Sequence, residues 1–179
     1  MEIETKVIDN YLDKDYLQHL KDIMVWGQMP YQLCKTVSGS ERSGEQSQYW
    51  YWYGTYVLYN KDGKFVKWYS REWTAFDAIK ALMQKIIDDN YGYAFIRAKA
   101  NFYPWTKNVF EHGGHTDYEF PHYGAVLSLN TCDGFTRLHD GTKIESVENR
   151  MVFFDASKTH NSSTTSNESG RFNINLNFR

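Results

Sequence analysis

The stretch 115–171 reads HTDYEFPHYGAVLSLNTCDGFTRLHDGTKIESVENRMVFFDASKTHNSSTTSNESGR, and its pattern predicts the fold. Short runs of β-branched and aromatic residues alternate with turn signals such as Asp133-Gly134 and Asp140-Gly141. Short strands separated by frequent turns are typical of a β-sandwich or jelly roll. Together with the flanking segments, about eight strands are predicted: 94–103, 115–118, 123–130, 135–139, 143–147, 150–155, 159–165 and 171–178.

Two histidines and one aspartate in this stretch form a candidate metal site. His115 and Asp117 are two residues apart, so extended backbone directs both side chains to the same side. His160 follows near the end of the strand series and is expected to fold back over them. Two imidazoles and one carboxylate hold iron(II) on one face and leave positions open opposite. His112 and His122 lie in the same glycine-containing segment, so other ligand choices remain open.

The last predicted strand carries polar residues at alternate positions. Arg171, Asn173, Asn175 and Asn177 share its inward face, because side chains alternate along a strand. Arg171 follows His160 by eleven residues and can pair bidentately with a carboxylate ligand. Polar groups inside a barrel are costly unless they are hydrogen-bonded. We therefore expect Asn173 or Asn175 to bind cosubstrate, ordered water or substrate, or else the asparagines to form a ladder satisfied within the sheet.

The N-terminal half is predicted to supply two helices and outer strands. Asp13 is a candidate N-cap for an amphipathic helix over 14–25, and a second apolar face predicts a helix over 73–89. The polar segment 38–48 is predicted to be a surface loop, with a mobile lid as the sharper hypothesis. Outer strands are predicted over 3–8, 32–37, 49–59 and 64–69, the last two joined by a turn over 60–63.

Size and charge narrow the class of protein. The chain has 179 residues, the length of one domain, with an N-terminal part over 1–93 and a β-core over 94–179. A net charge of -2 and a pI of about 6.3 argue against nucleic acid or a membrane as the main partner. Only Cys34 and Cys132 are present, so a reducing cytoplasm is favoured over a disulfide framework. The charged N-terminus has no apolar run, so no signal peptide is expected.

The C-terminal half resembles the 2-oxoglutarate and iron(II)-dependent oxygenases, within them the prolyl-4-hydroxylase-like branch. The likeness covers 94–178 and rests on motifs in that family's order: NFY before the HTD triplet, then SLN, GFTRL, NRMVFF, KTH and GRFNINLNF. The N-terminal half is similar, through weaker motifs, to small members encoded by marine bacteriophages. The resemblance implies a mainly β double-stranded β-helix, a cupin-like jelly-roll barrel braced by the two helices.

The resemblance also implies cofactors and a reaction. His115, Asp117 and His160 would bind Fe(II), and Arg171 would pair with the distal carboxylate of the cosubstrate 2-oxoglutarate. O2 would be consumed as 2-oxoglutarate is converted to succinate and CO2, with hydroxylation of an unactivated C–H; ascorbate is a candidate reductant. Family members that halogenate have lost the carboxylate ligand, so Asp117 favours hydroxylation.

Four further residues are implied to surround the cosubstrate. Tyr103 matches a tyrosine that hydrogen-bonds 2-oxoglutarate, and Thr136 matches a position that lines the same carboxylate pocket. Ser128 stands where many members have tyrosine, so one phenol is missing and either the pocket is wider or a water fills the space. Asn173 is expected to make a polar contact from the strand that carries Arg171.

Two other classes of protein remain open at this point. A cupin-like metal-dependent isomerase or small-ligand binder would share the barrel but would not need Arg171. A non-enzymatic jelly roll, such as a sugar-binding module, would use the aromatic residues of 49–59 for stacking. For an oxygenase, a prolyl residue in a peptide or protein is the first expectation for the substrate, and a small molecule is the alternative. The sequence predicts no oligomeric state.

Overall fold

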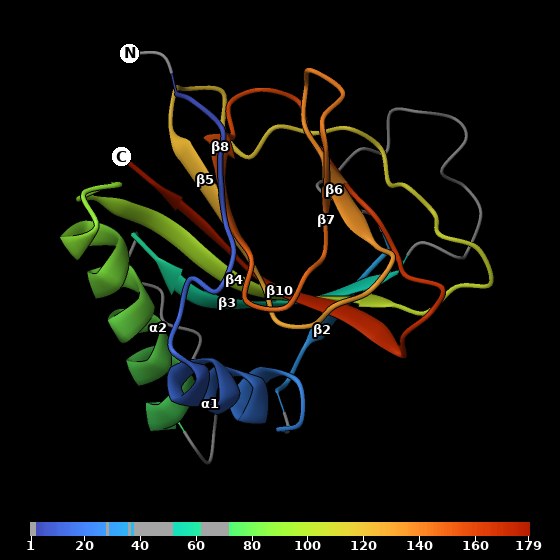
Figure 1. Ribbon diagram of the computed structural model, residues 1–179, viewed down its shortest axis with the longest axis horizontal. Coiled ribbons are helices and arrows are strands. Elements are labelled where there is room, and N and C mark those ends of the chain that lie inside the picture. Colours follow the sequence, from blue (N-terminus) through green and yellow to red (C-terminus); the bar gives the residue numbers. More distant parts are fainter. Residues whose placement is uncertain (1–2, 28, 36, 38–51, 62–71) are drawn as a thin grey trace.

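The computed structural model describes residues 3–27, 29–35, 37, 52–61 and 72–179 (Figure 1), with side chains in the second helix described from 77 onward. The predicted loop 38–48, the return strand 64–69 and parts of the predicted turn and aromatic strand lie outside the described residues. The remaining predictions for fold and site fall within them.

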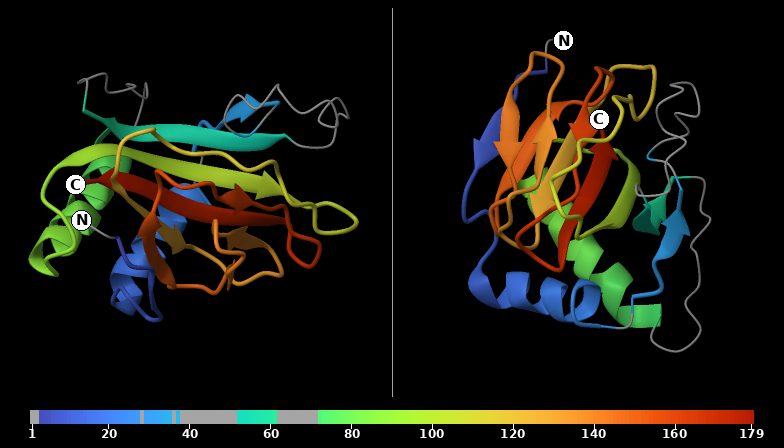
Figure 2. Two further views of the ribbon diagram at one scale, coloured as in Figure 1. Left: turned by 90° about the horizontal axis from the view of Figure 1, so that it is seen from above. Right: turned by 90° about the vertical axis from the view of Figure 1, so that its right-hand side faces the viewer.

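Most strands belong to one antiparallel sheet with the order β1-β8-β5-β10-β4-β3-β2, and a second sheet has the order β7-β6-β9. The two sheets lie face to face as a jelly roll (Figure 2), which confirms the predicted mainly β architecture. The strands are β1 (Lys6–Ile8), β2 (Gln32–Cys34), β3 (Tyr53–Asn60), β4 (Phe95–Pro104), β5 (Tyr123–Ser128), β6 (Phe135–Arg137), β7 (Lys143–Glu145), β8 (Met151–Asp155), β9 (Asn161–Ser162) and β10 (Gly170–Phe178).

Two helices cover the outer face of the large sheet, as predicted (Figure 1). Helix α1 (Lys14–Met24) begins after Asp13, whose side chain accepts a hydrogen bond from the Tyr16 amide at 2.8 Å. Helix α2 (Glu72–Asp88) lies beside it and reaches β3. Both helices lie within about one residue of the predicted bounds, because capping and apolar spacing are local signals.

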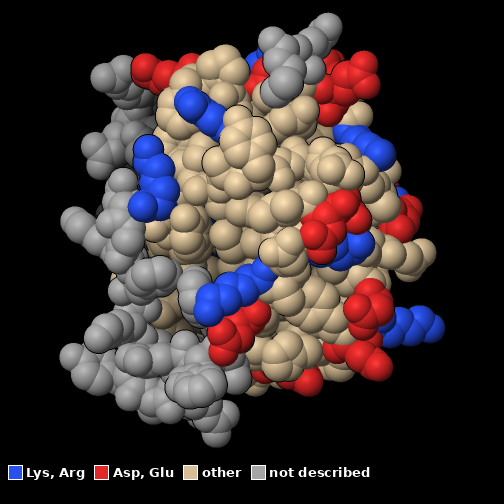
Figure 3. Space-filling view, turned by 90° about the vertical axis from the view of Figure 1, so that its left-hand side faces the viewer, with Lys and Arg blue, Asp and Glu red and all other residues tan. Residues whose placement is uncertain are grey.

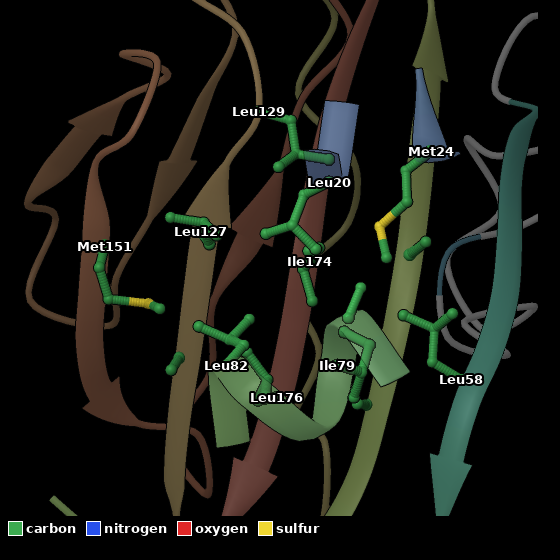
Figure 4. Packing of buried hydrophobic residues seen from close by; sticks show 14 of the residues in the cluster. Leu20, Met24, Leu58, Ile79, Leu82, Leu127, Leu129, Met151, Ile174 and Leu176 are labelled. Atoms are coloured by element: carbon green, nitrogen blue, oxygen red, sulfur yellow. The ribbon is translucent and has the colours of Figure 1, made fainter. Parts of the chain in front are cut away.

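The main core lies between these helices and the large sheet (Figure 4). Leu20 of α1 and Leu82 of α2 pack with strand residues such as Leu127 and Ile174. Neighbouring residues along each strand point the opposite way, so Val126 packs in a second cluster between the two sheets. Burying the apolar residues of β10 under the helices turns its alternate polar residues toward the interior of the barrel.

Two predicted strands near the candidate site are largely replaced by irregular backbone. Residues 115–118 contribute only an isolated bridge between His115 and His160. The segment 159–165 contains the short β9 and isolated bridges at His160, Ser163 and Thr165. Side-chain hydroxyls take over backbone partners here: Ser163 Oγ accepts a hydrogen bond from the Phe135 amide at 2.7 Å. Hydroxyl groups that hydrogen-bond to the backbone compete with a regular β-ladder. The composition of this segment predicted a strand and did not reveal this competition.

The surface agrees with the charge of the sequence. Basic and acidic side chains are interspersed on the face shown in Figure 3. Within the described ranges, no helix combines the length and the apolar character needed to cross a bilayer. Cys34 and Cys132 are both free thiols, in line with the expectation of no disulfide framework.

Candidate active site

The three predicted metal ligands converge inside the barrel. One ligand atom from each of His115, Asp117 and His160 lies within 4.8 Å of the others. The two histidines are joined through their backbones, with His115 N donating to His160 O at 3.0 Å and His160 N donating to His115 O at 2.9 Å. Their ring centroids are 4.5 Å apart, so this bridge brings together two imidazoles that are distant in the sequence.

The imidazoles present nitrogens that suit a metal. His160 Nδ1 lies 3.1 Å from the Lys158 carbonyl, which can only accept, so this nitrogen carries the proton. His160 Nε2 and His115 Nδ1 are buried and have no hydrogen-bond partner in the described structure. Burial lowers the pKa of His160, and burial together with the charge of His160 lowers the pKa of His115 to about 4. Both rings are therefore neutral near pH 7, the form that binds metal.

Asp117 supplies the negative charge of the site. Its carboxylate accepts from Arg97 Nη2 at 2.7 Å and from Asn177 Nδ2 at 2.9 Å, and the Arg97 contact is an ion pair. Burial opposes ionisation, yet the positive charges of Lys99 and Arg97 hold the pKa of Asp117 well below its usual value. An ionised carboxylate beside two neutral imidazoles fits the donor set of a ferrous ion.

Arg171 occupies the interior a short distance away. It is 1% exposed and donates from Nη1 to the Phe135 carbonyl at 2.7 Å and from Nη2 to Thr136 Oγ1 at 2.8 Å. Its guanidinium carbon lies 5.4 Å from the ring centroid of Tyr103. The described structure places no carboxylate within ion-pair distance of it, and its Nε is buried without a partner.

A cavity connects these two groups of residues. Its volume is about 40 Å³, and all three candidate ligands line it. Tyr103, Thr136 and Asn173 also line the cavity, whereas Arg171 contacts two of these lining residues. Ser128 is buried opposite Asn173 in the β5–β10 register and lies outside the lining. The structure thus brings together every predicted site residue except Ser128 at the cavity or directly beside it.

Polar residues of β4 complete the site, and of these only Tyr103 was among the predicted site residues. Arg97, Lys99, Asn101 and Tyr103 occupy alternate positions of this strand, and all except Arg97 line the cavity. The alternation with small apolar residues was visible in the sequence. It did not show which face of β4 would point inward.

The predicted asparagine ladder forms only in part. Asn101 Nδ2 donates to Asn173 Oδ1 at 3.0 Å, and Thr55 donates to Asn101 Oδ1 at 3.1 Å. Asn175 also lines the cavity, but its Oδ1 is buried without a partner. One asparagine is therefore satisfied within the sheet, while the next presents an acceptor to a ligand.

One tyrosine of the predicted aromatic strand also reaches the cavity. Tyr53 stacks on Tyr103 with 5.8 Å between ring centroids and belongs to the lining, whereas Tyr56 on the same strand is in the main core. Sheet packing and cavity lining are thus divided between neighbouring tyrosines.

Comparisons with solved structures identify the fold. The chain aligns over 98% of its length with 92% of a prolyl-4-hydroxylase from Pseudomonas putida (TM-score 0.61, 14% identity). It aligns over 97% with 84% of an oxidoreductase of the 2OG-Fe(II) oxygenase family from Burkholderia pseudomallei (TM-score 0.69, 12% identity). A prolyl hydroxylase from Trichoplax adhaerens, solved with a peptide fragment of the hypoxia inducible factor oxygen degradation domain, matches over 97% of this chain and 82% of its own (TM-score 0.63, 14% identity).

The jelly roll of this chain is therefore the fold found in 2-oxoglutarate and iron(II) oxygenases, prolyl hydroxylases included. No protein-family model matches the sequence, and no curated protein matches it significantly. Because a fold hosts many chemistries, the activity has to be argued from the residues of the cavity.

Proposed function

We propose that the protein is a 2-oxoglutarate- and Fe(II)-dependent dioxygenase that hydroxylates an unactivated C–H. The proposal rests on the buried Arg171, which has no acidic partner among the described residues and lies beside the cavity that His115, Asp117 and His160 line. A desolvated cation that lacks a counter-ion is costly unless a ligand supplies one. A dicarboxylate can pair with Arg171 through one carboxylate and reach a metal held by the two histidines and the aspartate through its other end.

Each residue then has a defined task. His115, Asp117 and His160 hold iron(II), and Arg97 with Asn177 orients the Asp117 carboxylate. Bound iron(II) supplies the O2 chemistry that couples conversion of 2-oxoglutarate to succinate and CO2 with substrate hydroxylation, with ascorbate as a candidate reductant.

The far end of the cavity binds the distal carboxylate of 2-oxoglutarate. The Nε of Arg171 and the second hydrogen of its Nη2 remain for a ligand. The hydroxyl of Thr136 accepts from Arg171, so its own proton is available to a carboxylate oxygen. Tyr103 forms the adjoining wall, Asn173 offers a polar contact from β10, and Ser128 supports Asn173 from the neighbouring strand.

The competing cupin-like reading is less well supported. An isomerase or a sugar-binding jelly roll can use the barrel and even the metal ligands, but it has no need of a buried guanidinium beside them. The substrate has two candidate classes. A prolyl residue in a peptide is one, since the Trichoplax enzyme was solved with a peptide fragment. A small molecule is the other.

Two measurements test the proposal. Anaerobic addition of 2-oxoglutarate to the Fe(II)-loaded protein should produce a metal-to-ligand charge-transfer band, and aerobic turnover should release succinate. His115→Ala and Asp117→Ala should abolish succinate formation, whereas His139→Ala, at an exposed histidine, should leave it at the wild-type rate. Wild-type turnover in either ligand variant would refute the ligand assignment.

A further inference from the structure

Lys99 is the charged group of the cavity that the proposed chemistry does not use. It lies on β4 directly opposite Asn175 of β10 and lines the same cavity as the three metal ligands. Among the residues that the structure describes, its ammonium group forms no hydrogen bond and no close ion pair, although its charge helps to lower the pKa of Asp117. Long cationic side chains usually reach solvent or a partner when they are partly buried, so this placement calls for an explanation.

Asp117 is the acidic residue that lines this cavity, and another cation already pairs with it. The carboxylate of Asp117 is paired with Arg97 and further hydrogen-bonded by Asn177. Burial and the nearby Arg97 lower the pKa of Lys99 to about 8, against the opposing effect of Asp117, so its ammonium form still predominates at pH 7. Lys99 is therefore a surplus positive charge, and a bound divalent metal would increase the surplus.

Lys99 is also separate from the proposed cosubstrate end. Tyr103, beside Arg171, is four residues further along the same strand face, which places the two Cα atoms roughly 13 Å apart. Asn101 lies between them and is satisfied by Thr55 and Asn173. A 2-oxoglutarate that extends from Arg171 to the metal therefore leaves Lys99 to a second ligand.

We infer that the substrate hydroxylated in this cavity carries a carboxylate that binds Lys99, an inference that rests on the proposed function. The neighbouring Asn175 Oδ1 is a buried acceptor without a partner among the described residues, so it suits an N–H or O–H of the substrate near that carboxylate. The carboxylate has two sources: a free organic acid or amino acid, or an acidic side chain of a peptide. A neutral prolyl peptide would leave the charge of Lys99 without a counter-ion.

Binding of a generic carboxylate tests this directly. The probe is trifluoroacetate, titrated by fluorine NMR into protein loaded with redox-inert Zn(II) and saturating 2-oxoglutarate, with trifluoroethanol as the neutral comparison. We expect saturable binding of trifluoroacetate, at least tenfold weaker in Lys99→Met and in Lys99→Gln. Lys107→Met, which removes an exposed lysine, should bind as wild type does.

Three outcomes overturn the inference: two in this titration and one in a separate titration of 2-oxoglutarate. Equal trifluoroacetate affinity in wild type and both folded Lys99 variants assigns the lysine no role in binding. Equal binding of trifluoroethanol shows that charge is not recognised. A loss of 2-oxoglutarate affinity in Lys99→Met as large as that in Arg171→Met would place Lys99 in the cosubstrate site instead.

The trifluoroacetate and 2-oxoglutarate titrations together separate this inference from the proposed function. If wild-type protein fails to bind 2-oxoglutarate, the dioxygenase proposal fails, while dependence of trifluoroacetate binding on Lys99 is still readable. Conversely, 2-oxoglutarate binding without any dependence on Lys99 retains the dioxygenase and rejects the carboxylate-bearing substrate.

Succinate release then distinguishes the two sources of carboxylate. Pools of free amino acids, amino-acid amides, acidic prolyl peptides and neutral prolyl peptides are each supplied to the Fe(II)-loaded enzyme. Stimulation confined to free acids or to acidic peptides supports the inference and names the source, and it should be lost in Lys99→Met. Stimulation by neutral peptides that persists in Lys99→Met overturns it.

Discussion

Two arginines lie toward opposite ends of the same strand pair, β4 and β10, and their surroundings differ. Arg97 faces Asn177 across the register and forms an ion pair with Asp117, with Nη2 and Oδ1 2.7 Å apart. Arg171 faces Tyr103 and is held by a carbonyl and a hydroxyl, with no carboxylate in range among the described residues. The charge of Arg97 is neutralised by an acid of the protein, whereas Arg171 has only neutral partners among the described residues.

This difference separates a structural role from a binding role. An ion pair between buried groups is disrupted when either partner is removed, because the other charge is left uncompensated. A buried cation without a counter-ion is costly to the free protein but contributes strongly when an anion arrives. Substitutions at the two arginines should therefore affect different quantities, and the following predictions are ordered by the size of the effect.

The largest effect is expected for Arg171→Met. The affinity for 2-oxoglutarate should fall roughly 100-fold or more, since a desolvated charge partner of the ligand is removed. Metal affinity should stay within about threefold of wild type, because the three ligands and Asp117's partners are untouched. Calorimetric titration of 2-oxoglutarate and of Zn(II) measures both quantities.

Arg137→Met is the matched control for that variant. Arg137 is partly exposed, forms an ion pair with Glu111 and belongs to the same strand as Thr136. Its replacement should leave the 2-oxoglutarate affinity unchanged. If Arg171→Met kept the wild-type affinity for 2-oxoglutarate, another residue would bind the distal carboxylate. Arg97 and Arg171 would then not differ as structural and binding residues.

A smaller effect, of the opposite kind, is expected for Arg97→Met. Without its guanidinium, the Asp117 carboxylate loses one of two partners that orient it, so metal affinity should fall about tenfold. The affinity for 2-oxoglutarate, measured at saturating metal, should change much less. The two variants would then show a crossed pattern in the two titrations, and a parallel loss of both affinities in each would contradict separate roles.

The smallest effect is expected for Thr136→Val. The substitution keeps the shape of the side chain but removes the hydroxyl that accepts from Arg171 and faces the cavity. Loss of one such hydrogen bond should weaken 2-oxoglutarate binding by roughly threefold to tenfold. Thr136→Ser, which restores the hydroxyl, should recover most of the affinity; failure to recover it would point to packing instead.

Much of this arrangement was predictable from local patterns. The HxD spacing, the position of His160, the alternation after Arg171 and the cap at Asp13 depend on residues close in the sequence. Irregular backbone at 115–118 was not predictable, because the bridge between His115 and His160 depends on two segments distant in the chain. The position of Lys99 in the cavity wall was not predicted. Helix packing against Ala98 and Ala100, on the other side of β4, decides which face of this strand points inward.

The sequence by itself determined which chemical groups the cavity contains: two imidazoles, a carboxylate, and polar residues at every second position of two strands. Only the tertiary structure decided how their charges are distributed. Pairing of charges depends on distance in space, so Arg97 is neutralised by an aspartate from another segment of the chain. Arg171 has no acid in range within the described structure, because the strands that surround it carry amides, hydroxyls and aromatic rings at the facing positions.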